Sequence, residues 1–273
     1  MNTTQKELLL QVKNLKISFS QYFKGTQKRI IQPISDLHVD INQGEIVAVV
    51  GASGSGKSLL AHAVLGILPS NAICQGQILY RGESLTEERK AQLRGREISF
   101  IPQSVNYLDP LMRVGKQVQI GLEKSIARKS QQELFQQYDL KESDGSLFPY
   151  ELSGGMLRRV LFATSVRKGV QLVIADEPTP GIHPQALSEI LRQIKRFAKE
   201  GAGVMLITHD IMSALEIADR VAVIKDGQTI EISEASAFEG KGDRLKTEYA
   251  KRLWRALPQN DFHLEFQING GGI

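Results

Sequence analysis

The hydrophobic positions in the first part of the chain follow the patterns of β-strands. Apolar residues alternate or run together at 8–12, 15–19 and 34–41, and Asn42-Gln43-Gly44 is a turn signal. Residues 46–50 are all apolar and mostly β-branched, which is typical of a strand buried in a parallel sheet. Apolar residues with helical spacing follow at 59–68, and Pro69 ends that pattern. We therefore predict several strands and then a helix.

The middle of the chain has a different character. Residues 87–96 are highly charged and are predicted to form a solvated helix, and residues 114–128 and 130–140 also have helical patterns. The order of strand, turn and helix resumes at 172–175 and at 204–208. A strand at 221–224 then leads through an Asp226-Gly227 hairpin turn into 228–232. These patterns predict an α/β core that is interrupted by a mainly helical insertion.

We interpret residues 1–258 as one domain. Its core takes residues 1–85 and 166–235, the helical insertion takes about 86–165, and a C-terminal helical extension takes 236–258, with a helix predicted at 245–257. Residues 259–273 include three consecutive glycines and are expected to form a flexible tail.

Composition narrows the class of protein further. The 273 residues are 41% hydrophobic and 23% charged, which is an ordinary globular balance. No apolar run approaches the ~18–20 residues of a membrane span, and we expect no signal peptide in residues 1–13. The net charge of +4 is too small to indicate nucleic acid or acidic lipid as a partner. The single cysteine, Cys74, excludes an internal disulfide and a multi-cysteine metal site, and we expect it to be buried.

A glycine-rich segment at 51–58 fits the phosphate-loop pattern G-x-x-x-x-G-K-[ST]. It follows the predicted buried strand and opens the predicted helix, which is the context that the pattern requires. Glycines let backbone N–H groups point at a phosphate, and the helix N-terminus adds a favourable dipole. Lys57 is expected to contact the β- and γ-phosphates, and the Ser58 hydroxyl to bind Mg²⁺. The predicted nucleotide-binding residues are Gly51, Ala52, Ser53, Gly54, Ser55, Gly56, Lys57, Ser58 and Leu59.

A second apolar run, at 173–175, ends in the carboxylates of Asp176 and Glu177. Ligands lie at the C-terminal ends of strands in parallel α/β sheets. Asp176 is therefore a candidate to hold Mg²⁺, and Glu177 a candidate general base for an attacking water. Alone, such a run can also be a strand that enters a charged loop, but the phosphate loop strengthens the prediction of a nucleotide site.

The segment Leu152-Ser153-Gly154-Gly155-Met156 separates the families of phosphate-loop proteins. A serine and two glycines at a helix start offer a hydroxyl and N–H groups to an anion, although an ordinary serine-capped helix also explains them. The segment resembles the signature of ABC ATPases, with Met156 where glutamine is most common. Three further matches follow the family's order: Gln103 resembles its Q-loop, Glu177-Pro178-Thr179 the start of its D-loop, and His209 its switch histidine. The resemblance covers about residues 8–258.

This resemblance implies a P-loop NTPase (RecA-like) core with an N-terminal antiparallel β subdomain and an inserted helical subdomain that carries the signature. It implies an ATPase that binds ATP and Mg²⁺. Gln103 is expected to sense Mg²⁺ and the attacking water, and His209 to contact the γ-phosphate. Ser153, Gly154 and Gly155 are expected to face the γ-phosphate held by an opposite subunit. In the family an N-terminal aromatic residue stacks on adenine, and we favour Tyr22 over Phe19 and Phe23 for that role.

The resemblance also implies partners and a place of action. These are two transmembrane permease subunits, a second ATPase subunit that is more often a different chain than an identical one, and indirectly an extracellular solute-binding protein. No nucleic acid is expected, and the chain is expected to be peripheral at the cytoplasmic face of the cell membrane. Softer similarities favour the importers of oligopeptides, dipeptides and nickel, namely residues 65–69, 108–110, 114–117, 153–157, 247–254 and 257–258. Peptide-importing members often carry a C-terminal cysteine cluster, which this chain lacks, so we favour nickel or a metal chelate over a peptide.

One departure concerns His183, which occupies the place of the usual aspartate in the D-loop. It affects the expected contacts across the subunit interface and leaves the hydrolysis residues in place. Three alternatives remain open. An ABC ATPase that acts on DNA would carry long coiled coils or zinc modules, and the sequence shows neither. A translation factor would carry two cassettes in one chain, and the sequence shows one set of motifs. A non-ABC phosphotransferase would use the signature-like run only as a helix cap.

Overall fold

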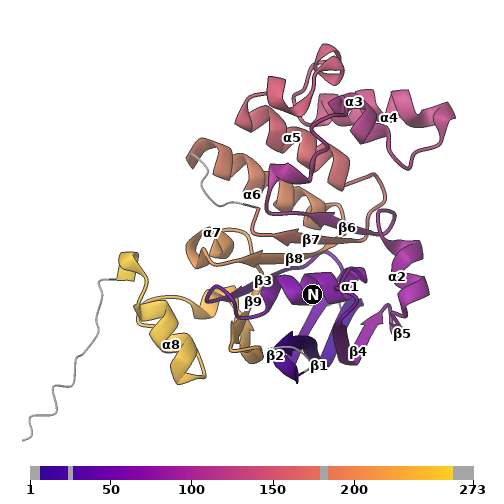
Figure 1. Cartoon of the computed structure of the whole chain (residues 1–273). Coiled ribbons are helices and arrows are strands. Elements are labelled where there is room, and N and C mark those ends of the chain that lie inside the picture. Colours follow the sequence, from indigo (N-terminus) through magenta and orange to yellow (C-terminus); the bar gives the residue numbers. More distant parts are fainter. Residues whose placement is uncertain (1–6, 24–26, 179–183, 261–273) are drawn as a thin grey trace, which may run out of the picture.

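The computed structural model describes residues 7–23, 27–178 and 184–260 (Figure 1). Its ten-stranded sheet has the order β5-β4-β1-β2-β10-β9-β3-β8-β7-β6. Four strands form an antiparallel part: β1 (Leu8–Phe23), β2 (Gln27–Asn42), β4 (Ala72–Tyr80) and β5 (Glu83–Ser84). This part is the N-terminal β subdomain that the family resemblance implies.

The other part of the sheet is mainly parallel. Strands β3 (Ile46–Gly51), β6 (Ile98–Ile101), β7 (Leu172–Asp176), β8 (Gly203–Thr208) and β9 (Arg220–Lys225) run in one direction, and β10 (Gln228–Glu234) pairs antiparallel with β9. Every residue of β3, β7 and β8 is buried, as expected for strands covered on both faces. The C-terminal ends of these strands meet at one edge, where ligands bind in such sheets.

Helices cover both faces of the parallel part (Figure 1). Helices α1 (Lys57–Leu65) and α2 (Glu87–Leu93) lie on the side of the antiparallel strands, and α3 (Val114–Gln119), α4 (Lys124–Gln137) and α5 (Gly154–Ser165) form a separate helical lobe. The remaining helices are α6 (Pro184–Lys199), α7 (Ile211–Leu215) and α8 (Glu248–Arg255). Short 3-10 turns occur at Val105–Tyr107, Glu142–Ser146, Pro149–Glu151, Ala235–Ala237 and Pro258–Asn260. No described helix is long and apolar enough to cross a bilayer.

The predicted α/β architecture is confirmed, but several elements differ from the prediction. Strand β6 pairs with β7 inside the segment 86–165 that we expected to be a helical insertion. The predicted boundary between the helices at 114–128 and 130–140 is also misplaced. The first helix ends before Gly121, where the chain turns with a φ of 74°, and α4 runs without a break through 128–130. Strand β4 was not predicted. Its first residues are exposed, so they lack a simple alternation.

The expectation that Cys74 is buried is wrong. Cys74 is exposed. It lies on β4, next to the edge of the sheet, and residues 73–77 of this strand are all exposed. The expected tail lies outside the described residues from position 261 onward.

Candidate functional site

The phosphate loop joins the buried strand β3 to helix α1, as the sequence predicted. Gly51 has no space for a side chain, because a Cβ there would lie 2.2 Å from the carbonyl oxygen of Ile224 on β9. Gly56 immediately precedes α1 with a φ of 96°, a left-handed conformation that favours glycine. The loop therefore needs glycine at both ends, and it leads into a helix N-terminus that can face an anion.

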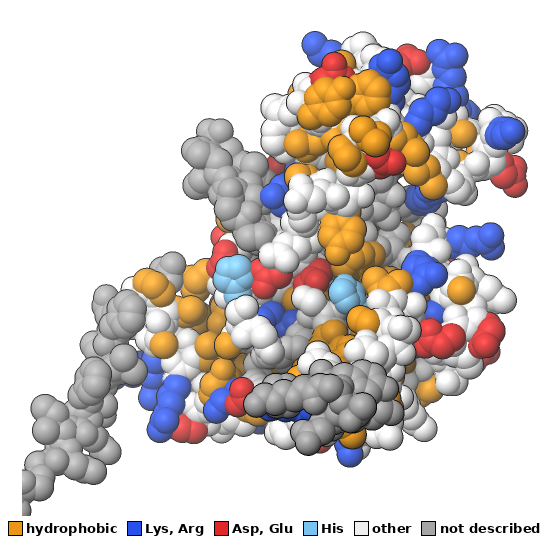
Figure 2. Space-filling model, in the orientation of Figure 1, with side chains coloured by type: hydrophobic (Ala, Val, Ile, Leu, Met, Phe, Trp, Pro, Cys, Tyr) orange, Lys and Arg blue, Asp and Glu red, His pale blue; other side chains and the backbone are white. Residues whose placement is uncertain are grey.

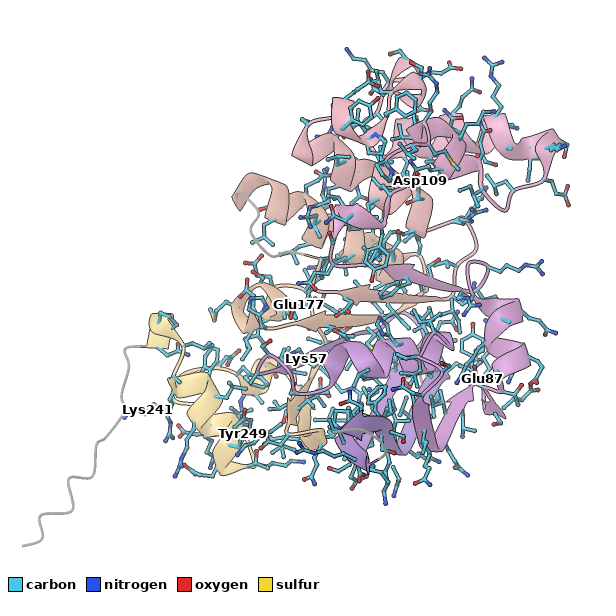
Figure 3. All side chains as sticks on the ribbon, in the orientation of Figure 1. Lys57, Glu87, Asp109, Glu177, Lys241 and Tyr249 are labelled. Atoms are coloured by element: carbon cyan, nitrogen blue, oxygen red, sulfur yellow. The ribbon has the colours of Figure 1, made fainter. Side chains whose placement is uncertain are left out.

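Lys57 is buried at the start of α1 and curls back over the loop. Its Nζ donates hydrogen bonds to the carbonyl oxygens of Gly51 and Ala52, both at 2.9 Å. Burial lowers the pKa of Lys57, and the nearby charges of Glu177 and Asp176 act in the opposite direction. The ammonium group is thus held against the backbone of the loop, on the same side of the molecule as Glu177 (Figure 3).

Ser58 and Asp176 come together across the sheet edge. The Ser58 hydroxyl donates to Oδ1 of Asp176 at 3.2 Å, which joins the start of α1 to the end of β7. Burial raises the pKa of Asp176, while the Ser58 hydrogen bond and the charge of His62 oppose that effect. The two oxygens form the pair that the sequence predicted as metal ligands.

Glu177 and His209 follow the neighbouring strands β7 and β8. Nδ1 of His209 lies 2.5 Å from Oε2 of Glu177, and the Glu177 N–H donates to the carbonyl oxygen of Ile207 at 2.8 Å. Glu177 has a φ of 47°, an uncommon conformation for a residue with a side chain that clusters at functional sites. Acidic and histidine side chains gather in the middle of the face shown in Figure 2. A carboxylate and an imidazole are therefore paired beside the phosphate loop.

Gln103 lies at the same edge of the sheet. It follows β6, whose last residue, Ile101, pairs with Ala175 of β7, so Gln103 emerges beside the end of β7. Its side chain is exposed and makes no hydrogen bond with another described residue. Gln103 therefore lies at the same sheet edge as Asp176 but makes no contact with Ser58 or Asp176, so its predicted role stays a prediction.

The signature-like residues begin helix α5. Ser153 caps the helix by accepting a hydrogen bond from the N–H of Met156 at 3.3 Å. Gly154 and Gly155 are exposed, and a Cβ built on either would meet nothing within 4 Å. Helix α5 belongs to the helical lobe, well apart from α1 (Figure 1). These residues therefore do not join the phosphate loop of their own chain.

Two residues near the site were not predicted to have a role. His62 lies on α1, packs edge-to-face on Phe100 with ring centroids 6.2 Å apart, and lowers the pKa of Asp176 through its charge. Its spacing of one helical turn after Ser58 was the available signal. Arg158 on α5 donates to the carbonyl oxygen of Pro178, and nothing in the sequence pattern indicates this contact.

Two further predictions lie outside the described residues. The side chain of Tyr22 is not described, although its backbone belongs to β1 and pairs with Lys28. His183 and the rest of 179–183 are also outside them. The described fold and site define a phosphate-loop nucleotide-binding protein of the α/β class.

The family follows from comparison with known proteins. Residues 34–180 match the model of the ABC transporter family. The oligopeptide transport ATP-binding protein OppD of Bacillus subtilis is 36% identical over 238 residues, which are 82% of this chain and 65% of that protein. The dipeptide transport ATP-binding protein DppD of Lactococcus lactis is 32% identical over 241 residues, 83% of this chain and 68% of that protein. The chain thus spans about two thirds of the length of these relatives. It belongs to the ABC transporter family, as its motifs predicted.

Solved structures agree on the fold. A dimeric ATP-binding cassette in a post-hydrolysis state, bound to ADP and phosphate, has a TM-score of 0.70 and 24% identity, and the match covers 83% of this chain and 99% of that chain. The predicted fold class, an ABC-type P-loop core with a β subdomain and a helical lobe, is confirmed.

Proposed function

We propose that this chain is an ATP-hydrolysing motor subunit of an ABC importer, which couples ATP binding and hydrolysis to the uptake of a small solute. The observation that carries the proposal is the pairing of Glu177 with His209, at 2.5 Å, beside the loop that holds Lys57. A carboxylate next to an imidazole at the phosphate end of a nucleotide site is suited to activating water.

Hydrolysis at such a site depends on positioning and electrostatics. We propose that Glu177 accepts a proton from the attacking water and that His209 orients Glu177 and contacts the γ-phosphate. Lys57 releases its two loop carbonyls and contacts the β- and γ-phosphates. Gln103 turns toward the water, and Tyr22 stacks on adenine.

Mg²⁺ fits the Ser58–Asp176 pair. Hydroxyl and carboxylate oxygens are the hard ligands that this ion prefers. Burial raises the pKa of Asp176, so a cation beside it would favour the charged carboxylate. Mg²⁺ held by these residues would supply positive charge that stabilises the negative charge of the phosphates during hydrolysis. Ser58, Asp176 and Gln103 are the proposed ligands, directly or through water.

A second ATPase subunit completes each site in this proposal. The exposed N-terminus of α5, with Ser153, Gly154 and Gly155, is available to an anion on another chain. The dimeric form of the similar solved cassette supports such an arrangement. Because His183 replaces the usual aspartate, we propose that the second subunit is a different chain.

Two permease subunits are the proposed membrane partners, at the cytoplasmic face, with an extracellular solute-binding protein acting through them. Large apolar side chains are exposed around the helical lobe, among them Tyr107 (66% exposed), Leu111 (86%) and Tyr150 (72%). Figure 2 shows hydrophobic side chains gathered over that lobe. Patches of this kind often mark protein interfaces.

The solute is proposed to be a peptide, nickel or a metal chelate. The names of the relatives favour oligopeptides or dipeptides. The lack of a C-terminal cysteine cluster was our reason to favour nickel or a metal chelate. Vesicles that contain the whole transporter separate these choices, when uptake of labelled dipeptide, nickel and nickel chelate is compared.

The assembly is tested by purifying the tagged full chain from its native membrane and identifying its partners by mass spectrometry. We expect two integral membrane proteins and a second, different ATPase chain. Two copies of this chain without another ATPase would contradict the heterodimer. Recovery with DNA and no membrane protein would contradict the transport function itself.

A further inference from the structure

Arg158 joins helix α5 to the turn that carries Glu177. It lies in the second turn of α5, and its Nη1 donates a hydrogen bond to the carbonyl oxygen of Pro178. The guanidinium group is half-buried, and burial lowers its pKa. Among the described residues, no carboxylate pairs with Arg158. Burying a charge without an ionic partner costs free energy, so stability alone does not explain an arginine here.

The turn that receives this hydrogen bond has an unusual conformation. Glu177 has a φ of 47°, which a non-glycine residue keeps only when its surroundings hold it there. Two tethers come from the strand side: the carbonyl oxygen of Ile207 accepts from the Glu177 N–H, and His209 pairs with the Glu177 carboxylate. Arg158 adds a tether from the helical lobe, one residue beyond Glu177.

We propose that Arg158 is a positioning residue that couples the Ser153 end of α5 to the alignment of Glu177. Ser153 is the N-cap of the helix on which Arg158 lies, so an anion bound at Ser153 would shift both residues together. The shift would move the carbonyl of Pro178 and thereby the carboxylate of Glu177. This inference rests on the proposed ATPase function, in which Ser153 faces the nucleotide of a second subunit.

The test uses the full chain assembled with its membrane partners, and compares Arg158→Met with Arg158→Lys. Arg159→Met is the matched control, because Arg159 lies on the same helix but donates to the carbonyl oxygen of Asp139, within the helical lobe. We expect Arg158→Met to lower kcat about 10- to 100-fold, since a displacement of ~1 Å near the reacting atoms has effects of that size. KM for ATP and the melting temperature should stay close to the parent values. Arg158→Lys retains a donor and should recover much of the rate, whereas Arg159→Met should behave like the parent.

A double-mutant cycle tests the coupling itself. If Arg158 transmits the state of Ser153, the variant with both Ser153→Ala and Arg158→Met should be about as slow as the slower single variant, rather than showing the product of both effects. Fully multiplicative effects would overturn the coupling. Equal losses in Arg158→Met and Arg159→Met, or a failure of Arg158→Lys to recover any rate, would overturn the positioning role.

Failure of this inference is distinguishable from failure of the proposed function. Suppose that the parent complex hydrolyses ATP and that the kcat of Arg158→Met stays within about twofold of the parent, the usual error in comparing variants. Then only the role of Arg158 is wrong. If the parent complex does not hydrolyse ATP at all, the proposed function is wrong.

Discussion

Nδ1 of His209 lies 2.5 Å from Oε2 of Glu177, although the two residues follow different strands. The pairing of Asp176 with Ile207 brings the ends of β7 and β8 level. The left-handed φ of Glu177 then turns the chain at the end of β7. The His209 side chain is 60% exposed, while that of Glu177 is only 14% exposed, so the imidazole is the member of the pair that faces solvent.

Replacing His209 should therefore slow hydrolysis more than it weakens binding. His209→Ala removes the group that orients Glu177, and we expect kcat of the assembled transporter to fall about 10²-fold, the cost of lost alignment. Affinity for ATP, measured with a fluorescent analogue, should change little. His38→Ala is the control, because His38 is exposed on the antiparallel strand β2. An unchanged kcat in His209→Ala would show that the pairing has no catalytic role.

Ser153 should matter to association with a partner subunit and not to the affinity of its own chain for ATP. Ser153→Arg places a bulky cation at the N-terminus of α5, which lies apart from the loop at 51–58. We expect the isolated chain to keep its ATP affinity. Its ATP-driven association with the second ATPase subunit, measured by light scattering, should be lost. Ser143→Arg, at another exposed serine of the helical lobe, should leave both the ATP affinity and the association unchanged. Loss of ATP binding by the isolated Ser153→Arg chain would contradict a site shared between subunits.

Asp176 should lower the stability of the nucleotide-free protein at neutral pH. Burial raises its pKa in the folded state, so the folded protein retains a proton that the unfolded chain has lost. Stability should then fall as the pH rises from the ordinary aspartate pKa to the raised one. Asp176→Asn removes that charge, so we expect a higher melting temperature at pH 7 and a flatter dependence on pH, together with loss of Mg²⁺-dependent ATP hydrolysis. A lower melting temperature at pH 7 would contradict this prediction.

Glu231 should stabilise the packing of the C-terminal helix α8 against the sheet. Its buried carboxylate on β10 accepts hydrogen bonds from the N–H groups of Lys246 and Thr247, at 2.8 and 2.7 Å, and from the Thr247 hydroxyl at 2.6 Å. Burial raises the pKa of Glu231, but these hydrogen bonds outweigh it and lower the pKa overall.

The stabilisation from Glu231 should be present above the ordinary glutamate pKa and be lost as the pH falls through the lowered one. Glu231→Gln should destabilise the protein by ~1.5–3 kcal/mol at pH 7, the range for hydrogen bonds to a charged group. Urea unfolding at several pH values measures both effects. Glu234→Gln, at an exposed position of the same strand, is the control, and equal effects of the two substitutions would contradict the role of Glu231.

The sequence allowed the central site to be predicted because its residues are close in sequence or follow uniform apolar runs. The loop at 51–58 carries its own pattern, and the buried strands β3, β7 and β8 deliver Asp176 and His209 to one edge. Strand β6 was missed because its four residues are too few to show a period. Cys74 was misplaced because burial along β4 depends on its place near the sheet edge.

Contacts between distant parts of the chain account for the features of the site that the sequence pattern did not predict. The hydrogen bond from Arg158 to Pro178 joins residues twenty positions apart, and the effect of His62 on Asp176 depends on how α1 packs against the sheet. The break at Gly121, by contrast, had a local signal, since glycine tolerates the φ of 74° that ends one helix before the next begins.

The most direct test of the proposed function uses the assembled transporter with Glu177→Gln. It measures the rate at which phosphate is released from ATP in the presence of Mg²⁺. The substitution keeps the shape of the side chain but removes the base, so we expect ATP to bind normally while turnover falls about 10²- to 10⁴-fold. Lys57→Ala, measured alongside, should instead lose affinity for ATP, which shows that the assay separates binding from chemistry. Turnover of Glu177→Gln at the parent rate would contradict the assignment of this site as the centre of ATP hydrolysis.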